Sequence, residues 1–342
     1  MGRSRFVGLP EARSRADYQA ASDEIESLLR QLPGFVALHR LGSVRHPGIS
    51  DLDRIAVVEA GHPVASIWSR LSPDVRYVAM HGPFLVDLDS FRARRWFTHL
   101  TGLELVAGDE LPVDEPSDPA RCDLHLAAEG LAQLELKLIQ QARTGRVKVR
   151  SVLCQFHAMG FSLMLAGLDK DDAPEAWDFV DAVRATREAW FEHAERDRPA
   201  IAARLMDRAP AALHDALLAL DRRLRGDRVV PAGSTAILRS PWDAVTLVAC
   251  DEASFGAEFF RAVNAGPLAA AIARSRRMGA VRWRMARERA PVPARVLGLL
   301  TETRKGATEL HRKRRQVITA YDRFLGTHGH GFSQIGLGGP FT

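Results

Sequence analysis

The chain has 342 residues, of which 46% are hydrophobic and 26% are charged, a balance that is ordinary for a globular protein with a buried core. The longest strongly apolar run, FSLMLAGL, is too short to span a bilayer, and MGRSRF lacks the apolar stretch of a signal peptide, so we expect a cytoplasmic protein with no membrane partner. The formal charge of +5 permits a polyanionic partner without requiring one, and the three cysteines, which show no CxxC spacing, favour reduced thiols over disulfides or a zinc site.

The first 115 residues are predicted to mix helices and strands. The stretch RADYQAASDEIESLLRQL (15–32) has helical apolar spacing. Short apolar runs predict strands at FVALHRLG (35–42), DRIAVVE (53–59), VRYVAMHG (75–82), PFLVDL (83–88) and LELVA (103–107). These patterns favour a mixed sheet with flanking helices.

A connector rich in Pro, Asp and Glu, GDELPVDEPSDPAR (108–121), then separates this part from a helical remainder. Apolar residues recur at helical spacing from Leu124 to Leu138, and Ser151 is the expected N-cap of a helix over 152–165. Further helices are predicted at 175–195 and 201–224, and STAILRS (234–240) with DAVTLVAC (243–250) as two pairing strands. We therefore expect an α+β protein with one domain at 1–115 and a mostly helical C-terminal domain at 116–342.

The stretch LGSVRHPGISDLDRIAVVE (41–59) places two aspartates, Asp51 and Asp53, at the entrance of a hydrophobic strand. In an extended strand, side chains two residues apart point the same way and lie roughly 7 Å apart. Two adjacent carboxylates repel each other unless a cation lies between them, and oxygen ligands are what Mg²⁺ or Mn²⁺ prefers. The pair therefore predicts a metal site, and the alternative is a surface turn with both aspartates solvated.

The order LHRLGS, VRHPGIS, DLDRIAVV resembles the nucleotidyltransferase superfamily, the polymerase-β-like fold, at the spacing of its minimal members. The resemblance implies an N-terminal nucleotidyltransferase fold that moves a nucleoside monophosphate from an NTP to a hydroxyl or phosphate and releases pyrophosphate. It also implies that Asp51 and Asp53 hold Mg²⁺ (or Mn²⁺) and that Gly42 and Ser43 contact the phosphates of the nucleotide. Arg45 is the nearest candidate for a cation against the triphosphate, and an exposed turn residue is its other interpretation.

The resemblance further implies a third carboxylate inside a hydrophobic-acid-hydrophobic triplet on a later strand. Two triplets qualify, VDL with Asp87 and LEL with Glu104. We prefer Asp87, because it ends an apolar run of strand length. The alternative for Asp87 is the N-cap region of a helix that begins at Asp89 or Ser90.

Weaker patterns follow in the C-terminal part. Arg187 with His193 has the loose Arg-His spacing of helical ribonuclease domains, but Arg150 with His157 matches equally well, so chance explains both better. His328 and His330 lack further metal ligands nearby.

Basic runs at 274–284, around Trp283, and at 312–315 are compatible with a nucleic-acid partner, although a solvated helix face explains such runs more often. The acceptor of a nucleotidyl group stays open between a small molecule, a sugar phosphate, a protein side chain and an RNA end. Two other functions compete with transfer: a catalytically degenerate fold that binds a nucleotide or a partner, and an RNA-binding module.

Overall fold

The computed structural model describes residues 5–59, 67–80, 83–96, 102–144, 146–226, 235–240, 243–248, 295–296 and 299. Contacts divide them into two compact units, which are described separately. The first, called the sheet unit, comprises the described residues from 10 to 122. The second, called the helical unit, comprises residues 5–9 and the described residues from 123 onward.

The sheet unit is built on a mixed four-stranded sheet in the order β4-β3-β2-β5. Its strands are β2 (Phe35–Leu41), β3 (Asp53–Val58), β4 (Phe84–Asp87) and β5 (Leu103–Gly108). β2 runs antiparallel to both of its neighbours, whereas β3 and β4 run parallel. The predicted mixed sheet with flanking helices is therefore confirmed for this part of the chain, and four of the five predicted strands are present.

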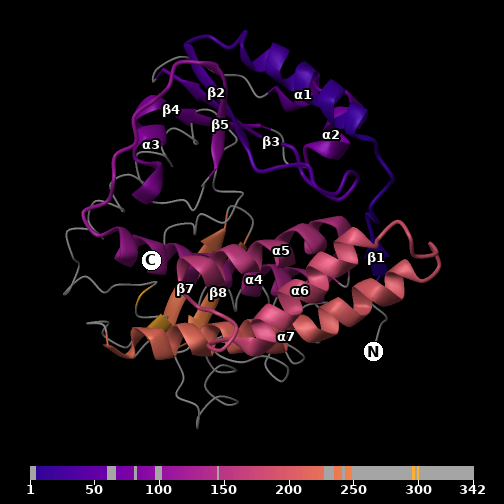
Figure 1. The fold of residues 1–342 in the computed structure, drawn as a ribbon, viewed down its shortest axis with the longest axis vertical. Coiled ribbons are helices and arrows are strands. Elements are labelled where there is room, and N and C mark those ends of the chain that lie inside the picture. The colour runs from indigo at the N-terminus through magenta and orange to yellow at the C-terminus, as the bar shows by residue number, and fades with distance from the viewer. Residues whose placement is uncertain are drawn as a thin grey trace. The chain divides into compact units, whose positions relative to one another are not determined.

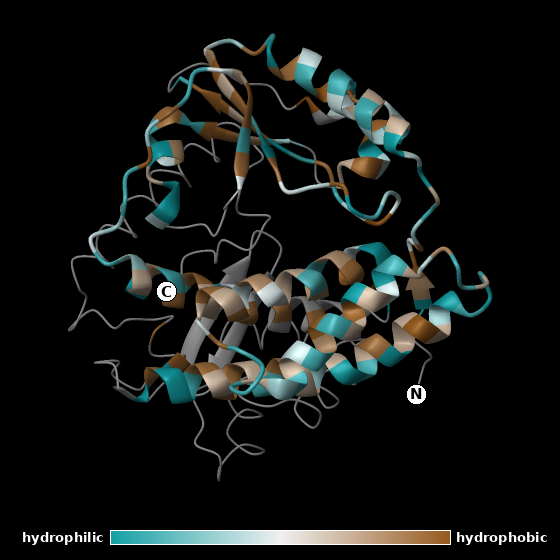
Figure 2. Cartoon of the chain, viewed as in Figure 1, coloured by the Kyte–Doolittle hydropathy of each residue, from teal (hydrophilic) through white to brown (hydrophobic). Residues whose placement is uncertain are grey.

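Helices cover both faces of this sheet (Figure 1). α1 (Arg15–Leu29) begins with a capping box, in which Ser14 Oγ accepts from the Asp17 amide and the Asp17 carboxylate accepts from the Ser14 amide. α2 (Pro73–Val78) packs against α1, and α3 (Leu88–Arg92) lies on the opposite face. Brown marks the hydrophobic residues of β3 and β4 in Figure 2. Residues 55–58 of β3 are fully buried. The apolar run after Asp53 is thus a core strand.

His39 shows how α3 meets the sheet. Its ring stacks on Phe91 of α3 with 4.6 Å between ring centroids, and the Arg94 guanidinium lies 4.1 Å from the centroid of the same Phe91 ring. Burial, with a smaller contribution from the positive charge of Arg94, lowers the pKa of His39 to about 4. The imidazole is therefore neutral at pH 7.

The helical unit contains α4 (Pro119–Thr144), α5 (Val149–Leu165), α6 (Pro174–Glu188) and α7 (Arg198–Arg223), with α4 beginning just before the contact boundary. β1 (Arg5–Val7) pairs in parallel with β6 (Arg146–Lys148), so the first described strand belongs to this unit. The contact boundary falls after residue 122, whereas the sequence suggested one after 115. The predicted strand pair is present as β7 (Thr235–Ser240) and β8 (Asp243–Val248), which are antiparallel.

Two predicted elements are wrong, both for reasons of capping. The run 75–82 was expected as a strand, but Ser72 accepts from the Val75 amide and Pro73 occupies the first helical turn, so the chain forms α2 there. Ser151 was expected as an N-cap, but α5 begins at Val149 and contains Ser151. Among the described residues, no helix is long and apolar enough to cross a membrane.

Candidate functional site

The sheet unit contains a pocket of about 620 Å³, which is within the size range of small-molecule sites. Three segments and one further residue form its wall: the first two turns of α1, the chain from the end of β2 to Val44, the entrance of β3, and Glu104 of β5. The lining residues are Arg15, Ala16, Tyr18, Gln19, Ser22, Arg40, Leu41, Gly42, Ser43, Val44, Asp51, Leu52, Asp53, Arg54 and Glu104. Three arginines and three carboxylates therefore share one concave surface.

Gly42 ends β2 in a left-handed conformation, with a φ of +67°. A Cβ atom at this position would meet nothing within 4 Å, so the backbone conformation, not crowding, favours glycine here. Ser43, the next residue, is exposed and lines the pocket. Gly42 and Ser43 thus both line the pocket, where a contact with phosphates requires them. Glycine at position 42 is explained by its left-handed backbone.

Asp51 and Asp53 both line this pocket. Their backbone differs from the expected continuous strand, because β3 begins at Asp53 and Asp51 precedes it. Oδ1 of Asp51 accepts from the amide of Met80 at 2.7 Å and from the amide of Leu52 at 2.9 Å. The Asp51 carboxylate therefore has a structural task at the end of α2 in addition to any role in the pocket.

Arg54, which follows Asp53 directly, is the buried charge of the pocket wall, with 2% of its surface exposed. Its Nε lies 3.3 Å from Oε1 of Glu26, its Nη2 bonds to Ser22 Oγ, and its Nη1 donates to the Asp53 carbonyl at 3.0 Å. Burial lowers the pKa of Arg54, and the carboxylate of Glu26 opposes that shift. These bonds join α1 to β3 directly beneath the pocket.

Glu104 is the acid that β5 contributes. It lies opposite Arg40 in the β2–β5 register, and the Arg40 guanidinium donates to its carboxylate through Nη2 and, at 3.2 Å, through Nε. That hydrogen bond lowers the pKa of Glu104 and raises the pKa of Arg40. Glu104 is therefore an ionised carboxylate at neutral pH on the same pocket wall as Asp51 and Asp53.

The structure does not bring Asp87, the preferred third carboxylate, to this site. β3 and β4 run parallel and Asp87 pairs with Val58, so it lies at the opposite end of β3 from Asp53. Its carboxylate accepts from the Ser90 amide at 2.9 Å and from Ser90 Oγ at 2.7 Å, as the N-cap of α3. The helix-capping alternative is confirmed, and Asp87 is not among the residues that line the pocket with Asp51 and Asp53.

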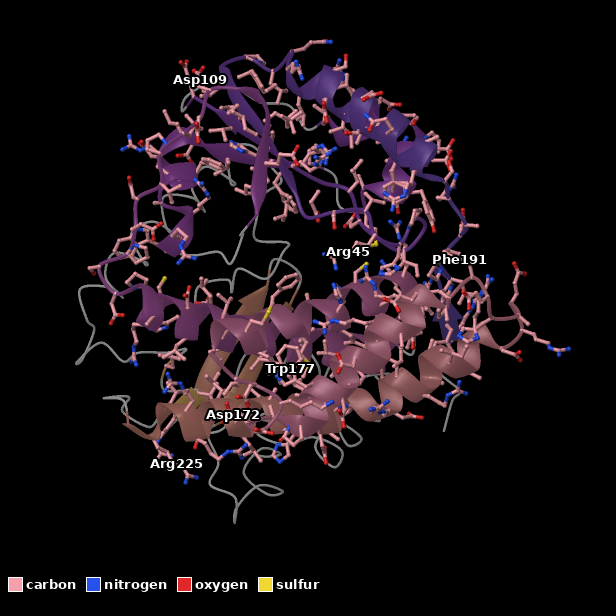
Figure 3. The ribbon with its side chains drawn as sticks, viewed as in Figure 1. Arg45, Asp109, Asp172, Trp177, Phe191 and Arg225 are labelled. Atoms are coloured by element: carbon pink, nitrogen blue, oxygen red, sulfur yellow. The ribbon has the colours of Figure 1, made fainter. Side chains whose placement is uncertain are left out.

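Other candidates lie elsewhere. Arg45 is exposed and does not line the pocket, although it follows the lining residue Val44 (Figure 3). In the helical unit, α6 ends at Glu188, so His193 is not on the same helix as Arg187, whose Nη1 donates to the Leu153 carbonyl at 3.1 Å.

Arg150 and His157 both lie on α5, two turns apart, and their role stays a prediction. Three other patterns lie outside the described residues: the histidines His328 and His330, the basic runs, and Trp283.

Sequence reasoning missed the residues that α1 contributes, Arg15, Gln19 and Ser22, and the arginines Arg40 and Arg54 of the strands. A signal existed for Arg54, because a charged residue inside an otherwise apolar core strand needs a partner. Nothing local to α1 indicates that its first turns face the entrance of β3.

The donor set limits how a metal ion is held. Among the described residues, no group of three His, Cys, Asp or Glu side chains could hold a metal ion. Mg²⁺, however, is usually bound through one or two carboxylates together with phosphates of the substrate and water. Asp51 and Asp53 therefore fit a metal that arrives with a phosphate ligand.

We compared the chain with models of protein families, with curated proteins and with solved structures, and none of the three comparisons found a match. The pocket and its residues are therefore what indicates a function.

Proposed function

We propose that the sheet unit is a nucleotidyltransferase, which binds a nucleoside triphosphate with Mg²⁺ or Mn²⁺ in the pocket and transfers the nucleoside monophosphate to an acceptor. The supporting observation is that Gly42, Ser43, Asp51 and Asp53 all line one pocket. These four residues come from two parts of the sequence motif, and each carries the chemistry that a metal–triphosphate ligand needs.

The pocket residues divide between phosphate and metal. The Ser43 hydroxyl and the exposed turn after Gly42 offer donors to phosphate oxygens, and Arg15 and Arg40 supply positive charge. Asp51 and Asp53 would hold the divalent cation. When bound, that cation stabilises charge on the phosphates and acidifies an attacking hydroxyl.

In the transfer, an acceptor oxygen forms a bond to the α-phosphorus of the NTP while the bond to the β-phosphate oxygen breaks. Pyrophosphate leaves, and the acceptor, if it is a hydroxyl, loses its proton to a carboxylate or to water. Glu104 replaces Asp87 as our candidate for the carboxylate that helps this proton leave, because it lines the same pocket as Asp51 and Asp53.

The first test is calorimetry with ATP, GTP, CTP and UTP, each with Mg²⁺ and with EDTA. We expect binding of at least one NTP that needs the divalent cation, because the pocket carboxylates otherwise repel the triphosphate. Asp53→Asn is expected to abolish that binding. The control is Asp109→Asn, which changes an exposed aspartate of the same unit outside the pocket (Figure 3). Equal NTP affinity with and without Mg²⁺ contradicts the proposed site.

The second test identifies the acceptor. The protein is incubated with the α-³²P form of the bound NTP, Mg²⁺ and a cell extract, and the labelled product is identified. A labelled small molecule, protein or RNA end separates the acceptor classes. Transfer is expected to fall in Glu104→Gln and to persist in Asp87→Asn.

A second function, a nucleotide-binding unit without turnover, has its own supporting observation. Asp51 already accepts two backbone hydrogen bonds, and Asp87 lies at the far end of the sheet. This function gives metal-dependent NTP binding in the first test and no labelled product in the second.

A third candidate, an RNA-binding module in the basic C-terminal runs, remains a prediction from the sequence. Its measurement is the salt dependence of RNA affinity, which is steep when several phosphates are neutralised.

A further inference from the structure

Seven residues separate Ser43 from Asp51 in the sequence, and the last five of them, His46–Ser50, are called here the Gly48 turn. The amides of Ile49 and Ser50 donate to the His46 carbonyl at 3.0 and 2.8 Å, and the His46 amide donates to Ser50 Oγ at 3.1 Å. Gly48 has a φ of +87°, which only glycine adopts without strain. The shape of this turn therefore sets where the two parts of the pocket wall stand relative to each other.

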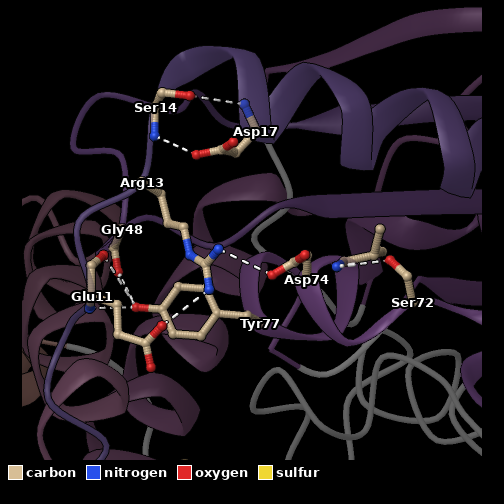
Figure 4. A network of polar contacts seen from close by, with 9 residues as sticks. Glu11, Arg13, Ser14, Asp17, Gly48, Ser72, Asp74 and Tyr77 are labelled. Atoms are coloured by element: carbon tan, nitrogen blue, oxygen red, sulfur yellow. Dashed lines mark hydrogen bonds and ion pairs between the residues drawn. The ribbon is translucent and has the colours of Figure 1, made fainter.

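Two tyrosine hydroxyls hold the turn from outside. Tyr18 of α1 donates through Oη to the Ser50 carbonyl at 2.6 Å and accepts from the Gly48 amide at 3.1 Å. Tyr77 of α2 donates through Oη to the Gly48 carbonyl at 3.0 Å and accepts from the Glu11 amide at 2.6 Å (Figure 4). Both main-chain polar groups of Gly48 are thus bonded to phenol groups.

The bond to the Ser50 carbonyl reaches Asp51 directly. That carbonyl and the Asp51 amide belong to one planar peptide unit, so Tyr18 fixes the plane from which the Asp51 backbone continues. The Met80 and Leu52 amides then fix Oδ1 of the Asp51 side chain. Main chain and side chain of Asp51 are therefore both held before β3 begins at Asp53.

The two tyrosines differ in their relation to the pocket. Tyr18 is 3% exposed and is a lining residue, whereas Tyr77 does not line the pocket. Tyr77 instead contacts the segment that precedes α1. The Arg13 guanidinium stacks 4.6 Å from the centroid of the Tyr77 ring and also pairs with Asp74 (Figure 4).

We propose that Tyr18 is a positioning residue for the transfer reaction: its hydroxyl holds the Ser50–Asp51 peptide so that Asp51 and Asp53 present their carboxylates to the pocket in the reactive geometry. The inference rests on the proposed function. Without the hydroxyl, the buried Gly48 amide and Ser50 carbonyl lose their hydrogen bonds to Tyr18, and the turn shifts to replace those bonds. A displacement of about 1 Å is enough to lower a rate about 100-fold.

The experiment compares Tyr18→Phe with Tyr77→Phe, since each removes one phenol hydroxyl that bonds to the main chain of the Gly48 turn. Amide hydrogen exchange is measured in the metal-free protein, and kcat and KM are measured with the NTP that binds in calorimetry. For Tyr18→Phe we expect exchange at least about 10-fold faster at the Gly48 and Leu52 amides, a kcat about 10–100-fold lower, and a KM within about threefold of wild type. For Tyr77→Phe we expect faster exchange at the Glu11 amide, with kcat within about twofold.

The outcomes separate this inference from the function on which it rests. Wild-type protein that binds no Mg-NTP, or that binds it and transfers nothing, overturns the proposed function, and the role of Tyr18 with it. The inference alone is overturned if the wild-type protein transfers the nucleotidyl group and Tyr18→Phe transfers it with the same kcat. It is also overturned if Tyr18→Phe and Tyr77→Phe lower kcat equally. If Tyr18→Phe does not fold, the wild-type protein tests the inference, because the Gly48 amide donates to Tyr18 Oη. That amide is expected to be protected from exchange at least about 10-fold, and exchange at the rate of an exposed amide overturns the inference.

Discussion

Replacing Asp87 separates a helix cap from a catalytic acid, because the two roles respond differently to asparagine and alanine. As the N-cap of α3, Asp87 accepts two hydrogen bonds from Ser90 and is 8% exposed. Asp87→Ala removes the cap, at about 1 kcal/mol, and leaves the buried Ser90 hydroxyl without that acceptor, at about 1 kcal/mol more. We expect a loss of about 2 kcal/mol, or about 5 °C in Tm.

Asp87→Asn is expected to cost less than about 1 kcal/mol, because asparagine is as favourable an N-cap as aspartate. Both variants are expected to keep NTP binding and transfer, since Asp87 lies at the end of β3 far from Asp53. The measurements are urea denaturation and the labelled-NTP assay, with wild type beside both variants. An Asp87→Asn protein of wild-type stability that no longer transfers would refute the reasoning, because a cap does not need a carboxylate.

Two further predictions concern buried charge. Arg54→Met is expected to destabilise the protein by about 3 kcal/mol in urea denaturation, because the half-buried carboxylate of Glu26 loses the guanidinium that pairs with it. The double variant, Arg54→Met with Glu26→Leu, is expected to recover part of that stability. A double variant as unstable as Arg54→Met contradicts the pairing. His39 has its pKa lowered to about 4 from an ordinary value of 6.5, so below pH 6.5 the unfolded chain takes up the proton first. The stability that comes from this pKa difference is complete above pH 7 and falls by up to about 3 kcal/mol as the pH drops to 4. His39→Leu is expected to lack this pH-dependent loss, which is measured by denaturing both proteins at pH 7, 5.5 and 4.5. The same acid loss in both proteins contradicts this assignment.

The parts of the fold that the sequence predicts are those with a strong local cause. The helix from Arg15 has helical apolar spacing, and the apolar run that follows Asp53 forms a core strand. Where local cues conflict, capping decides the outcome. The apolar run after Val75 has strand composition, but Ser72 and Pro73 start a helix before it.

The site is less predictable because it depends on strand direction and order. Asp87 and Glu104 lie in similar triplets, and nothing in either triplet states which end of the sheet it reaches. β4 runs parallel to β3, so the end of β4 that carries Asp87 lies away from Asp53. β5 runs antiparallel to β2, so Glu104 near the start of β5 lies near the end of β2. Glu104 pairs with Arg40, the residue before Leu41, which ends β2. Long-range pairing, not local composition, selects the acid.

The pairing of β1 with β6 sets a constraint on how the chain folds during synthesis. Phe6 lies opposite Val147, so the first strand waits about 140 residues for its partner, while the whole sheet unit is made in between. At ribosomal rates of about 5–20 residues per second, that interval lasts about 7–28 s. Residues 10–122 of the sheet unit are therefore all synthesised before β6. Removing β1 from the N-terminus would leave β6 of the helical unit without its partner strand. The sheet unit, which follows β1 directly in the sequence, would keep all of its strands.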